Sequence, residues 1–496
     1  MYKAFKIFNQ ALQKINVGKK DYDAIVVGSG PNGLSAAITM QQAGLSVMLI
    51  EGKNTVGGGM RCAEFTLPGF IHDVCSAIHP LAIGSPFFKT LPLKEHGLEF
   101  IHPPIAAAHP FDDGTVSALY TSIEETAQAL DEEKLSYLNL MQPLVKDWQK
   151  ITADVLAPLH FPKHPVCMAR FGLKALTSAT HLSKHFRSKQ AKGLWAGMAA
   201  HSIQPLSNVT TSAIALVLMI TAHTDGWPMA KGGSVAVANA LASYFVSLGG
   251  TIETNFYVRS LNQLPSAEAL LFDVTPKQLL KIAGHKFSSL YKWQLQRYRY
   301  GMGVFKVDWA LDAPIPFTAQ KCRQAGTVHL GNTLEEIEAS EELTSQGKHP
   351  EKPFVLLTQP SLFDASRAPN GKHTAWAYCH VPNGSSFDMT ERIEKQVERF
   401  APGFKERILA RRVMNTVQME EYNPNYIGGD INGGIINASQ LFTRPALRLS
   451  PYKTSSKGIY ICSSSTPPGG GVHGMCGYHA AKKTLKEIFK ISVNSV

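Results

Sequence analysis

The stretch that decides the fold is "DAIVVGSGPNGLSAA", residues 23–37. Its opening "DAIVVG" (23–28) is a short apolar run, which is typical of a buried parallel strand. The small residues that follow predict a helix ending near Gly44, since glycine is favoured just after a helix end. A second apolar run, "SVMLIE" (46–51), comes directly afterwards. The order strand, glycine turn, helix, strand predicts a βαβ unit.

Three glycines in the turn have the spacing of a dinucleotide fingerprint. Gly28 permits the tight turn, Gly30 lets the backbone approach a pyrophosphate, and Gly33 lets the helix pack closely on the strand. Glu51, at the end of the second strand, would accept hydrogen bonds from a ribose diol and repel a 2′-phosphate. A purely structural turn is the alternative, and the two strands and the acid argue against it.

A second glycine turn, "VGGGMRC" (56–62), follows soon after the second strand. Gly58, Gly59 and Arg61 would grip the same diphosphate from its other side, with the guanidinium supplying positive charge. Taken alone, the motif is equally an ordinary turn followed by a surface arginine.

The chain closes with "SSSTPPGGGVHGMCGYHAAKKTL" (463–485), which has a cluster of glycines immediately before a final helix. Backbone without side chains at a helix N-terminus suits an anionic or flat group that must come close. A long turn is the alternative.

Composition and charge indicate a globular protein and argue against nucleic-acid binding. The chain has 496 residues, of which 44% are hydrophobic and 18% charged, as expected for a globular protein of two or three lobes. The net charge is +11, but no tract of interleaved arginine and aromatic residues occurs, so nucleic-acid binding is not expected.

The first 20 residues are basic and amphipathic. Met1, Phe5, Phe8, Leu12 and Ile15 recur at helical spacing with lysines around them. Two interpretations are equally favoured: a helix lying in a membrane interface, or a helix docked on the protein's own surface or on a second subunit.

Cysteine usage and hydropathy argue against a disulfide-bonded, zinc-binding or membrane-spanning protein. The seven cysteines include no CxxC pair, which indicates reduced thiols and no disulfide framework or zinc site. The longest nearly unbroken apolar run, "AIALVLMITA" (213–222), is too short for a membrane span, which needs about 20 residues. No HExxH or other metal-ligand pattern is found, so no metal is expected.

The rest of the chain divides into alternating parts. Helical character dominates from about 122 to 222, beginning with "SIEE", a capping-box pattern. We expect a discontinuous α/β protein: a basic N-terminal helix (1–20), a dinucleotide-binding domain in three parts (21–105, 230–285 and 415–496), and a substrate domain in two (106–229, with the helical subdomain, and 286–414).

Two short strands are expected between 250 and 261. A further buried strand is expected from 268 to 276, and another in "GIYICSSS".

The motifs together resemble the FAD-binding fold shared by the phytoene desaturase and monoamine oxidase families. More narrowly, the chain resembles the phytoene desaturase-like group that includes proteins named after a pyridine nucleotide-disulfide oxidoreductase domain. The resemblance covers nearly the whole chain after residue 20 and includes "GWPMAKGGSVAVANAL", "NPNYIGGDI" and "GIYICSSSTPPGGGVHGMCGYHAA".

The resemblance implies FAD as the cofactor and a place for the tail. It implies that the glycine-rich turn covers the ribityl chain and ring edge, through Ser464, Ser465, Gly470, Gly471 and Val472. Many relatives have an acid where Ser465 stands, and serine can still accept that hydrogen bond. The resemblance also implies that Val258 offers backbone hydrogen bonds to adenine, whereas the residues alone would make it a core valine.

Two histidines are candidate catalytic residues. His473 lies inside the flavin turn and His79 in "SAIHPLA", and either could move protons beside the ring. The alternative for each is a structural imidazole bonded to backbone. Tyr426 and Asp430 are candidates for the cavity wall, although an irregular glycine loop would also explain them.

The predicted function is FAD-dependent dehydrogenation of an apolar, isoprenoid or lipid-like small molecule, with hydride passing to flavin N5. The alternatives are a redox-neutral polyene isomerase that uses reduced FAD, an amine oxidase, and a flavin-binding interaction protein without turnover. We expect a cytoplasmic protein, or an organelle-matrix protein in a eukaryote, with peripheral membrane contact if residues 1–20 form an interface helix.

Overall fold

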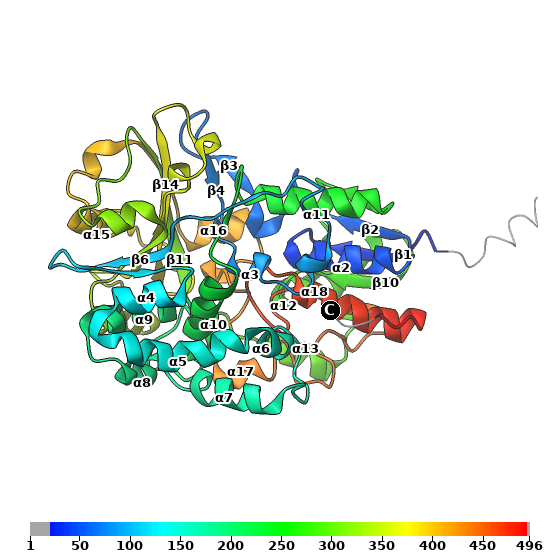
Figure 1. Cartoon of the computed structure of the whole chain (residues 1–496). Helices are drawn as coiled ribbons and strands as arrows, with labels where there is room; N and C mark the ends of the chain where they lie inside the picture. The colour runs from blue at the N-terminus through cyan, green and yellow to red at the C-terminus, as the bar shows by residue number, and fades with distance from the viewer. Residues whose placement is uncertain (1–19, 494–496) are drawn as a thin grey trace, which may run out of the picture.

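The computed structural model describes residues 20–493 (Figure 1). The prediction of an amphipathic helix in residues 1–20 therefore falls outside the described residues, apart from Lys20. Within the described chain, no helix combines the length and the apolar character needed to cross a bilayer.

A parallel five-stranded sheet forms one half of the molecule (Figure 1). Its order is β16 (Ile459–Ile461), β10 (Ala267–Phe272), β1 (Tyr22–Val27), β2 (Val47–Ile50), β9 (Thr251–Glu253). Parallel register places Val26 between Leu49 and Leu271. The strands come from 21–105, 230–285 and 415–496, the three parts expected to form the dinucleotide-binding domain.

The alternation of side chains along β1 explains why both faces of this sheet are covered. Ala24 and Val26 belong to a core formed with α2 (Pro31–Gln42), α11 (Val235–Ser247) and α18 (Met475–Thr484). Ile25 and Val27 belong to the opposite core, formed with α12 (Pro276–Ala283) and α13 (Ser289–Gln296). A buried parallel sheet between two helical layers confirms the predicted α/β, Rossmann-type fold.

A mixed seven-stranded sheet forms the second half. Its order is β15 (Ile408–Met414), β11 (Gly303–Leu311), β14 (His373–Val381), β13 (Val355–Thr358), β12 (Ala325–Leu330), β6 (Ile105–Pro110), β7 (Val116–Leu119). One face packs against α15 (Thr390–Phe400), through Ile393 and Val397. The other face packs against α14 (Leu334–Ser345) and the helical region.

The helical region lies where the sequence predicts it. It contains α4 (Ile123–Ala129), α5 (Lys134–Lys146), α6 (Trp148–Val155), α7 (Pro165–Ala175), α8 (Ala179–Leu182), α9 (Lys189–Ala200) and α10 (Thr211–Thr224). The Ser122 hydroxyl accepts a hydrogen bond from the Glu125 N–H at 3.1 Å, so Ser122 is the N-cap of α4. Trp195 and Leu216 are buried at the centre of this layer.

Short elements connect the two halves. They are α3 (Pro80–Ile83), α16 (Thr416–Tyr422), α17 (Ala438–Leu441), the hairpin of β3 (Cys62–Glu64) and β4 (Ile71–Asp73), and the pair β5 (Phe100–Ile101) and β8 (Met229–Ala230).

The prediction of two strands between 250 and 261 was half wrong, because only β9 forms. The N–H groups of Asn255 and Phe256 instead bond to the carbonyls of Lys53 and Glu51. The chain therefore turns across the end of β2.

Candidate functional site

A cavity of about 420 Å³ opens at the carboxyl ends of β1, β2 and β10. Residues 27–32, 50–53 and 273–275 line it at this edge of the sheet. Open parallel sheets bind ligands at this edge, and the volume falls within the range of small-molecule sites, about 300–1,000 Å³. The cavity is therefore the candidate cofactor and substrate site.

The three glycine-rich segments meet beside this cavity. The Gly57 N–H donates to the Ser29 carbonyl at 3.0 Å, which joins the second glycine turn to the fingerprint. A Cβ at Gly33 would lie 1.9 Å from the Gly28 oxygen, and one at Gly477 would lie 1.8 Å from the Asn32 oxygen. Side chains cannot fit at either position, so α2 packs directly on the fingerprint and α18 packs directly on α2.

Most of the candidate site residues line the cavity, and four do not. The lining residues are Gly28, Gly30, Glu51, Gly58, Gly59, Arg61, His79, Val258, Ser464, Gly471 and Val472. The four outside the lining are Gly33, Ser465, Gly470 and His473.

Glu51 lies at the end of β2 with a side chain that already makes hydrogen bonds. Its Oε2 accepts from the Ser29 N–H and hydroxyl, and its Oε1 accepts from the Lys53 N–H at 2.9 Å. These bonds hold the carboxylate at the cavity wall with lone pairs left over. The arrangement suits an acid that accepts further hydrogen bonds from a diol.

Arg61 is a buried cation facing the cavity. Only 6% of its surface is exposed, its Nε donates to the Gly58 carbonyl at 3.0 Å, and its guanidinium lies over the Tyr422 ring. Within the described part of the chain, no carboxylate forms an ion pair with it. Because a buried charge needs a partner, an anionic group in the cavity fits this position.

Two buried polar atoms at the same end of the cavity also have few partners. Asn32 Oδ1 makes no hydrogen bond within the described chain, and Thr275 Oγ1 has only the Tyr300 hydroxyl as a neighbour; both residues line the cavity. The unpaired groups, the α2 N-terminus and the absence of side chains at the glycine turn fit a bound dinucleotide.

Asp273 is a buried acid beneath the glycine turn that sequence reasoning missed. Its Oδ2 accepts from the Gly33 N–H at 2.9 Å, and burial raises its pKa to about 7, helped by the nearby Glu51. An acid directly after a buried strand, at the ligand-binding edge of the sheet, is the signal that could have found it.

Ser465 does not point toward the cavity, contrary to expectation. Its hydroxyl donates to the Gly433 carbonyl at 2.7 Å and the residue is fully buried. The Arg444 guanidinium fixes this part of the turn by donating hydrogen bonds to the Ser464 and Ser465 carbonyls. Of the two predicted serines, Ser464 is therefore the one that lines the cavity, together with the preceding Ser463. Gly470 packs instead against Asn432.

His473 also lies outside the cavity lining. Its Nδ1 accepts from the Met475 N–H at 3.0 Å at the start of α18, and its carbonyl accepts from the Ser85 hydroxyl. Burial lowers its pKa to about 4, so the ring is neutral at physiological pH. These contacts give His473 a structural position that caps the final helix.

His79 is the candidate histidine that does face the cavity. The Ser234 hydroxyl donates to the Ser76 carbonyl, so it must accept from His79 Nε2–H, 3.1 Å away. His79 Nδ1 then carries a lone pair, and it has no partner within the described chain. Burial lowers the pKa of His79 to about 4, which keeps the ring neutral.

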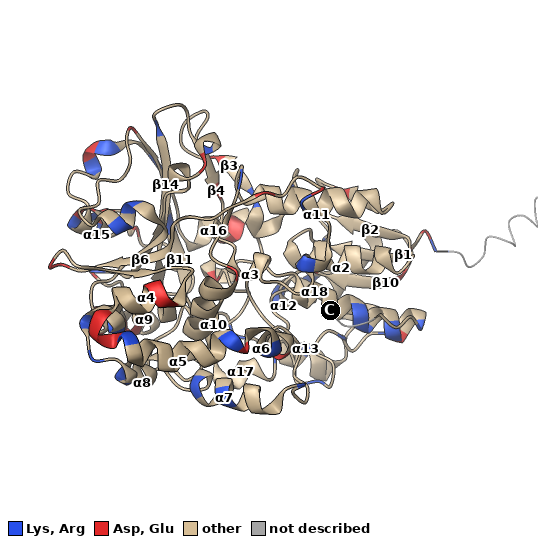
Figure 2. Ribbon diagram, viewed as in Figure 1, with Lys and Arg blue, Asp and Glu red and all other residues tan. Residues whose placement is uncertain are grey.

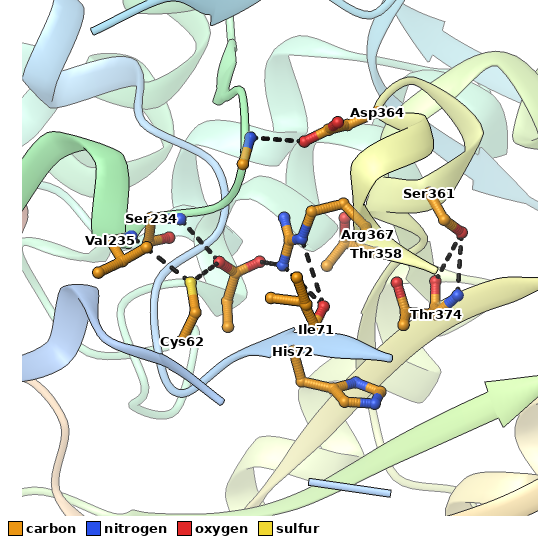
Figure 3. A network of polar contacts seen from close by, with 12 residues as sticks. Cys62, Ile71, His72, Ser234, Val235, Thr358, Ser361, Asp364, Arg367 and Thr374 are labelled. Atoms are coloured by element: carbon orange, nitrogen blue, oxygen red, sulfur yellow. Dashed lines mark hydrogen bonds and ion pairs between the residues drawn. The ribbon is translucent and has the colours of Figure 1, made fainter. Parts of the chain in front are cut away.

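A buried ion pair fixes the position of Ser234 (Figure 3). Asp73, on β4, accepts from Arg367 at 2.7 Å and from the Ser234 N–H at 2.8 Å. Burial opposes ionisation of Asp73, but Arg367 and the Ser234 N–H outweigh it and hold its pKa below the usual value. Cys62 donates to the same carboxylate, and burial raises the pKa of this thiol. The network therefore holds Ser234 in place, and Ser234 in turn fixes the orientation of the His79 ring.

The opposite wall of the cavity is apolar and aromatic, and its residues were not found from sequence. It comes from α10, the segments that follow α9 and α10, and the seven-stranded sheet: His201, Ile203, Leu218, Trp227, Thr327, Leu356, Thr358, Trp376 and Tyr378. Tyr426, noted in the sequence, also lines the cavity, whereas Asp430 is buried beside it and bonds to the Gly301 and Gly434 N–H groups.

Comparisons with known proteins agree with this architecture. Residues 26–89 match the family model of NAD(P)-binding Rossmann-like domains. The chain is 25% identical to pyridine nucleotide-disulfide oxidoreductase domain-containing protein 2 of Mus musculus, over 95% of this chain and 94% of that protein. It is 22% identical to a lycopene-forming phytoene desaturase of Pseudescherichia vulneris, over 93% and 98%. A solved oxidoreductase structure from Methanosarcina mazei superposes with a TM-score of 0.65 at 13% identity, over 94% and 100%.

The fold and the cavity define the class first: a protein with a Rossmann-type, dinucleotide-binding domain. The full-length similarities then confirm the resemblance to phytoene desaturase-like proteins predicted from the sequence, and with it the class of FAD-dependent oxidoreductases. A solved putrescine oxidase structure shares the fold, with a TM-score of 0.60 at 16% identity over 95% of this chain and 99% of that one.

Proposed function

We propose that this protein is an FAD-dependent oxidoreductase that dehydrogenates an apolar, isoprenoid or lipid-like substrate. The polarity of the cavity carries the proposal. Its charged residues gather at the dinucleotide end, whereas the wall formed by α10, the segments that follow α9 and α10, and the seven-stranded sheet includes no Asp, Glu, Lys or Arg among the described residues. An apolar wall favours a substrate without charge. The related phytoene desaturase supports the isoprenoid class.

The residues that would hold FAD follow from the site. The α2 N-terminus and Arg61 suit the diphosphate, and Glu51 suits the adenosine ribose. Val258 lines the cavity from an irregular segment after β9, where its backbone groups are available to adenine. Ser464, Gly471 and Val472 line the region assigned to the ring.

The chain's own residues would position the substrate and move its proton. When bound, the flavin supplies the redox chemistry by accepting a hydride from a substrate carbon. Leu218, Trp227 and Trp376 would hold the reacting carbon and exclude water. His79 Nδ1 would take the proton, and because burial keeps its pKa near 4 the ring would release it again to solvent.

One contact argues against an amine as the substrate. The buried Lys306 ammonium lies 5.1 Å from the centre of the Trp376 ring and pairs with Asp308. A cation therefore already occupies one face of this aromatic residue, which leaves that face unavailable to a substrate ammonium.

An anaerobic titration tests the proposed reaction. The flavin-loaded protein would be mixed with phytoene or squalene in detergent, and with putrescine as the amine control, while flavin absorbance is recorded. We expect bleaching by an apolar substrate and none by putrescine. Conversion of a polyene only by photoreduced protein, without net oxidation, would favour the isomerase. Absence of electron exchange with lipids, quinones and oxygen would favour the interaction protein.

Membrane contact through residues 1–20 belongs to the same proposal, because an interface helix would bring the enzyme to apolar substrates. Flotation with liposomes, compared between the full chain and a chain lacking these residues, tests it. Equal flotation would remove the proposal.

A further inference from the structure

Five exposed apolar side chains cluster in and around α7. Leu159 and Phe161, just before the helix, are 77% and 84% exposed, and Val166, Leu173 and Leu176 are 74%, 79% and 54% exposed. We call these five residues, with Lys163, Arg170 and Lys174, the α7 surface.

Helix α7 is apolar on both faces. Phe171 and Ala175 are buried against the helical layer, while Val166 and Leu173 project on the other side at helical spacing. The solvent face of a surface helix is normally polar, and a contiguous exposed apolar patch marks an interaction site.

The charge around this surface has one sign. The sequence contains no Asp or Glu from residue 155 to residue 224, and the α7 ribbon carries blue but no red (Figure 2). Lys482, on α18, lies near this surface, since burial and the neighbouring charge of Lys163 lower its pKa. Two carboxylates border this surface and are already paired: Asp147 with Lys150 and Arg170, and Asp154 with His160.

The surface continues toward α17. Thr210 donates through its N–H to the Thr177 carbonyl, at the end of α7, and through its hydroxyl to the Ile436 carbonyl, just before α17. Phe442, directly after α17, is 55% exposed. Figure 1 shows α7 and α17 along the same edge of the molecule.

We propose that the α7 surface docks this protein on an anionic lipid bilayer. Apolar side chains would enter the boundary between headgroups and acyl chains, while Lys163 and Lys174 meet lipid phosphates. A second copy of the chain suits the surface less well, since a two-fold interface would bring the same positive charges together. The α7 surface is formed by residues other than 1–20. Vesicle binding requires no turnover, so the inference is independent of the proposed chemistry.

Sedimentation with vesicles tests the inference on the full-length protein. We expect binding to vesicles of phosphatidylcholine with phosphatidylglycerol, and much weaker binding to phosphatidylcholine alone. Lys163→Ala and Lys174→Ala should each weaken the partition constant about fivefold, the effect of one cation near an anionic surface. The triple variant Leu159→Ser, Phe161→Ser, Leu173→Ser should weaken it tenfold or more.

The control replaces exposed apolar residues elsewhere: Val246→Ser, Leu409→Ser and Val417→Ser, which are 53%, 47% and 46% exposed. Because all six positions face solvent, circular dichroism and flavin content should stay unchanged in both triple variants.

Three outcomes would overturn the inference. In the first, the α7 triple variant binds phosphatidylglycerol vesicles as well as the wild type, or the wild type does not bind. In the second, removal of residues 1–19 abolishes binding completely. In the third, the wild type is a dimer that the α7 triple variant converts to a monomer, which would identify a second copy as the occupant.

Discussion

Replacing Asp273 with asparagine should remove the pH dependence of stability that this buried acid causes beneath the glycine turn. Burial raises the pKa of this acid from 3.8 to about 7. As pH rises from about 4 to 7, the unfolded carboxyl ionises while the folded one keeps its proton. The stability present below pH 3.8 is therefore lost as pH rises through 7. At about 1.4 kcal/mol per pH unit, the loss is about 4 kcal/mol.

Asparagine retains an oxygen for the Gly33 N–H but cannot ionise. The unfolding free energy of Asp273→Asn, relative to wild type, should therefore increase by about 4 kcal/mol between pH 4 and pH 8. Denaturant unfolding followed by tryptophan fluorescence at a series of pH values measures this difference. Asp113→Asn, at an exposed position whose pKa is already about 2, is the control and should show no change over this range.

The same variant should change cofactor binding. A bound diphosphate favours the protonated form of Asp273, so the FAD dissociation constant of the wild type should rise about tenfold per pH unit above 7. The constant of Asp273→Asn should stay flat, as measured by fluorescence titration. A wild type and variant that differ by the same amount at every pH, in both assays, would refute the reasoning about this carboxyl.

Three further predictions concern buried charges and histidines. Arg61→Gln should raise the FAD dissociation constant at least tenfold, since hydrogen bonds to charged groups contribute about 1.5–3 kcal/mol; an unchanged constant in a fluorescence titration would contradict this. Arg367→Met should lower the unfolding free energy by about 3–5 kcal/mol at pH 7, because it leaves Asp73 buried and unpaired. That loss should shrink as pH falls, because burial raises the pKa of Asp73 once Arg367 is gone and the carboxyl of the variant then takes up a proton; a constant loss in denaturant unfolding at pH 3 and 7 would argue against the pair. Burial lowers the pKa values of His79 and His473 to about 4, so both rings should remain neutral in NMR spectra at pH 5.5. The stability that each neutral ring contributes above pH 6.5 should be lost as pH falls toward 4. Imidazolium signals at pH 5.5 would show that the rings are accessible to water.

Local patterns in the sequence were sufficient for the dinucleotide half of the molecule. The strand at 22–27, the helix at 31–42 and the strand at 47–50 follow from apolar runs and glycine spacing within about 30 residues. Gly44 has a φ of +84° directly after that helix, as its position predicted. These elements form from short-range preferences, so neighbouring residues are enough to identify them.

The direction of side chains in the tail turn was beyond such patterns. Ser464 and Ser465 are adjacent and chemically identical, yet one faces the cavity and the other bonds to Gly433. The choice depends on Arg444, whose guanidinium holds the carbonyls of both serines. Contacts of this kind join segments that no local pattern relates.

The substrate wall could not be predicted for the same reason. Trp376 and Tyr378 lie on β14, between β11 and β13, while His201 and Leu218 belong to the helical region. Their convergence depends on how a seven-stranded sheet packs against helices from a different part of the chain. The acid-free stretch from 155 to 224, by contrast, was visible in the sequence, but only the structure shows which of its apolar residues remain exposed.

Charged groups line one end of this cavity and apolar groups line the other, and this arrangement fits the proposed reaction. Arg61 and the α2 N-terminus provide positive potential at one end, where an elongated anionic cofactor would be anchored. The apolar wall at the other end contributes no carboxylate or ammonium from the described residues, so a charged substrate would lose its hydration without gaining a partner there. Selection for uncharged substrates would therefore come from the cost of desolvation. The enzyme would not need a specific contact to recognise them.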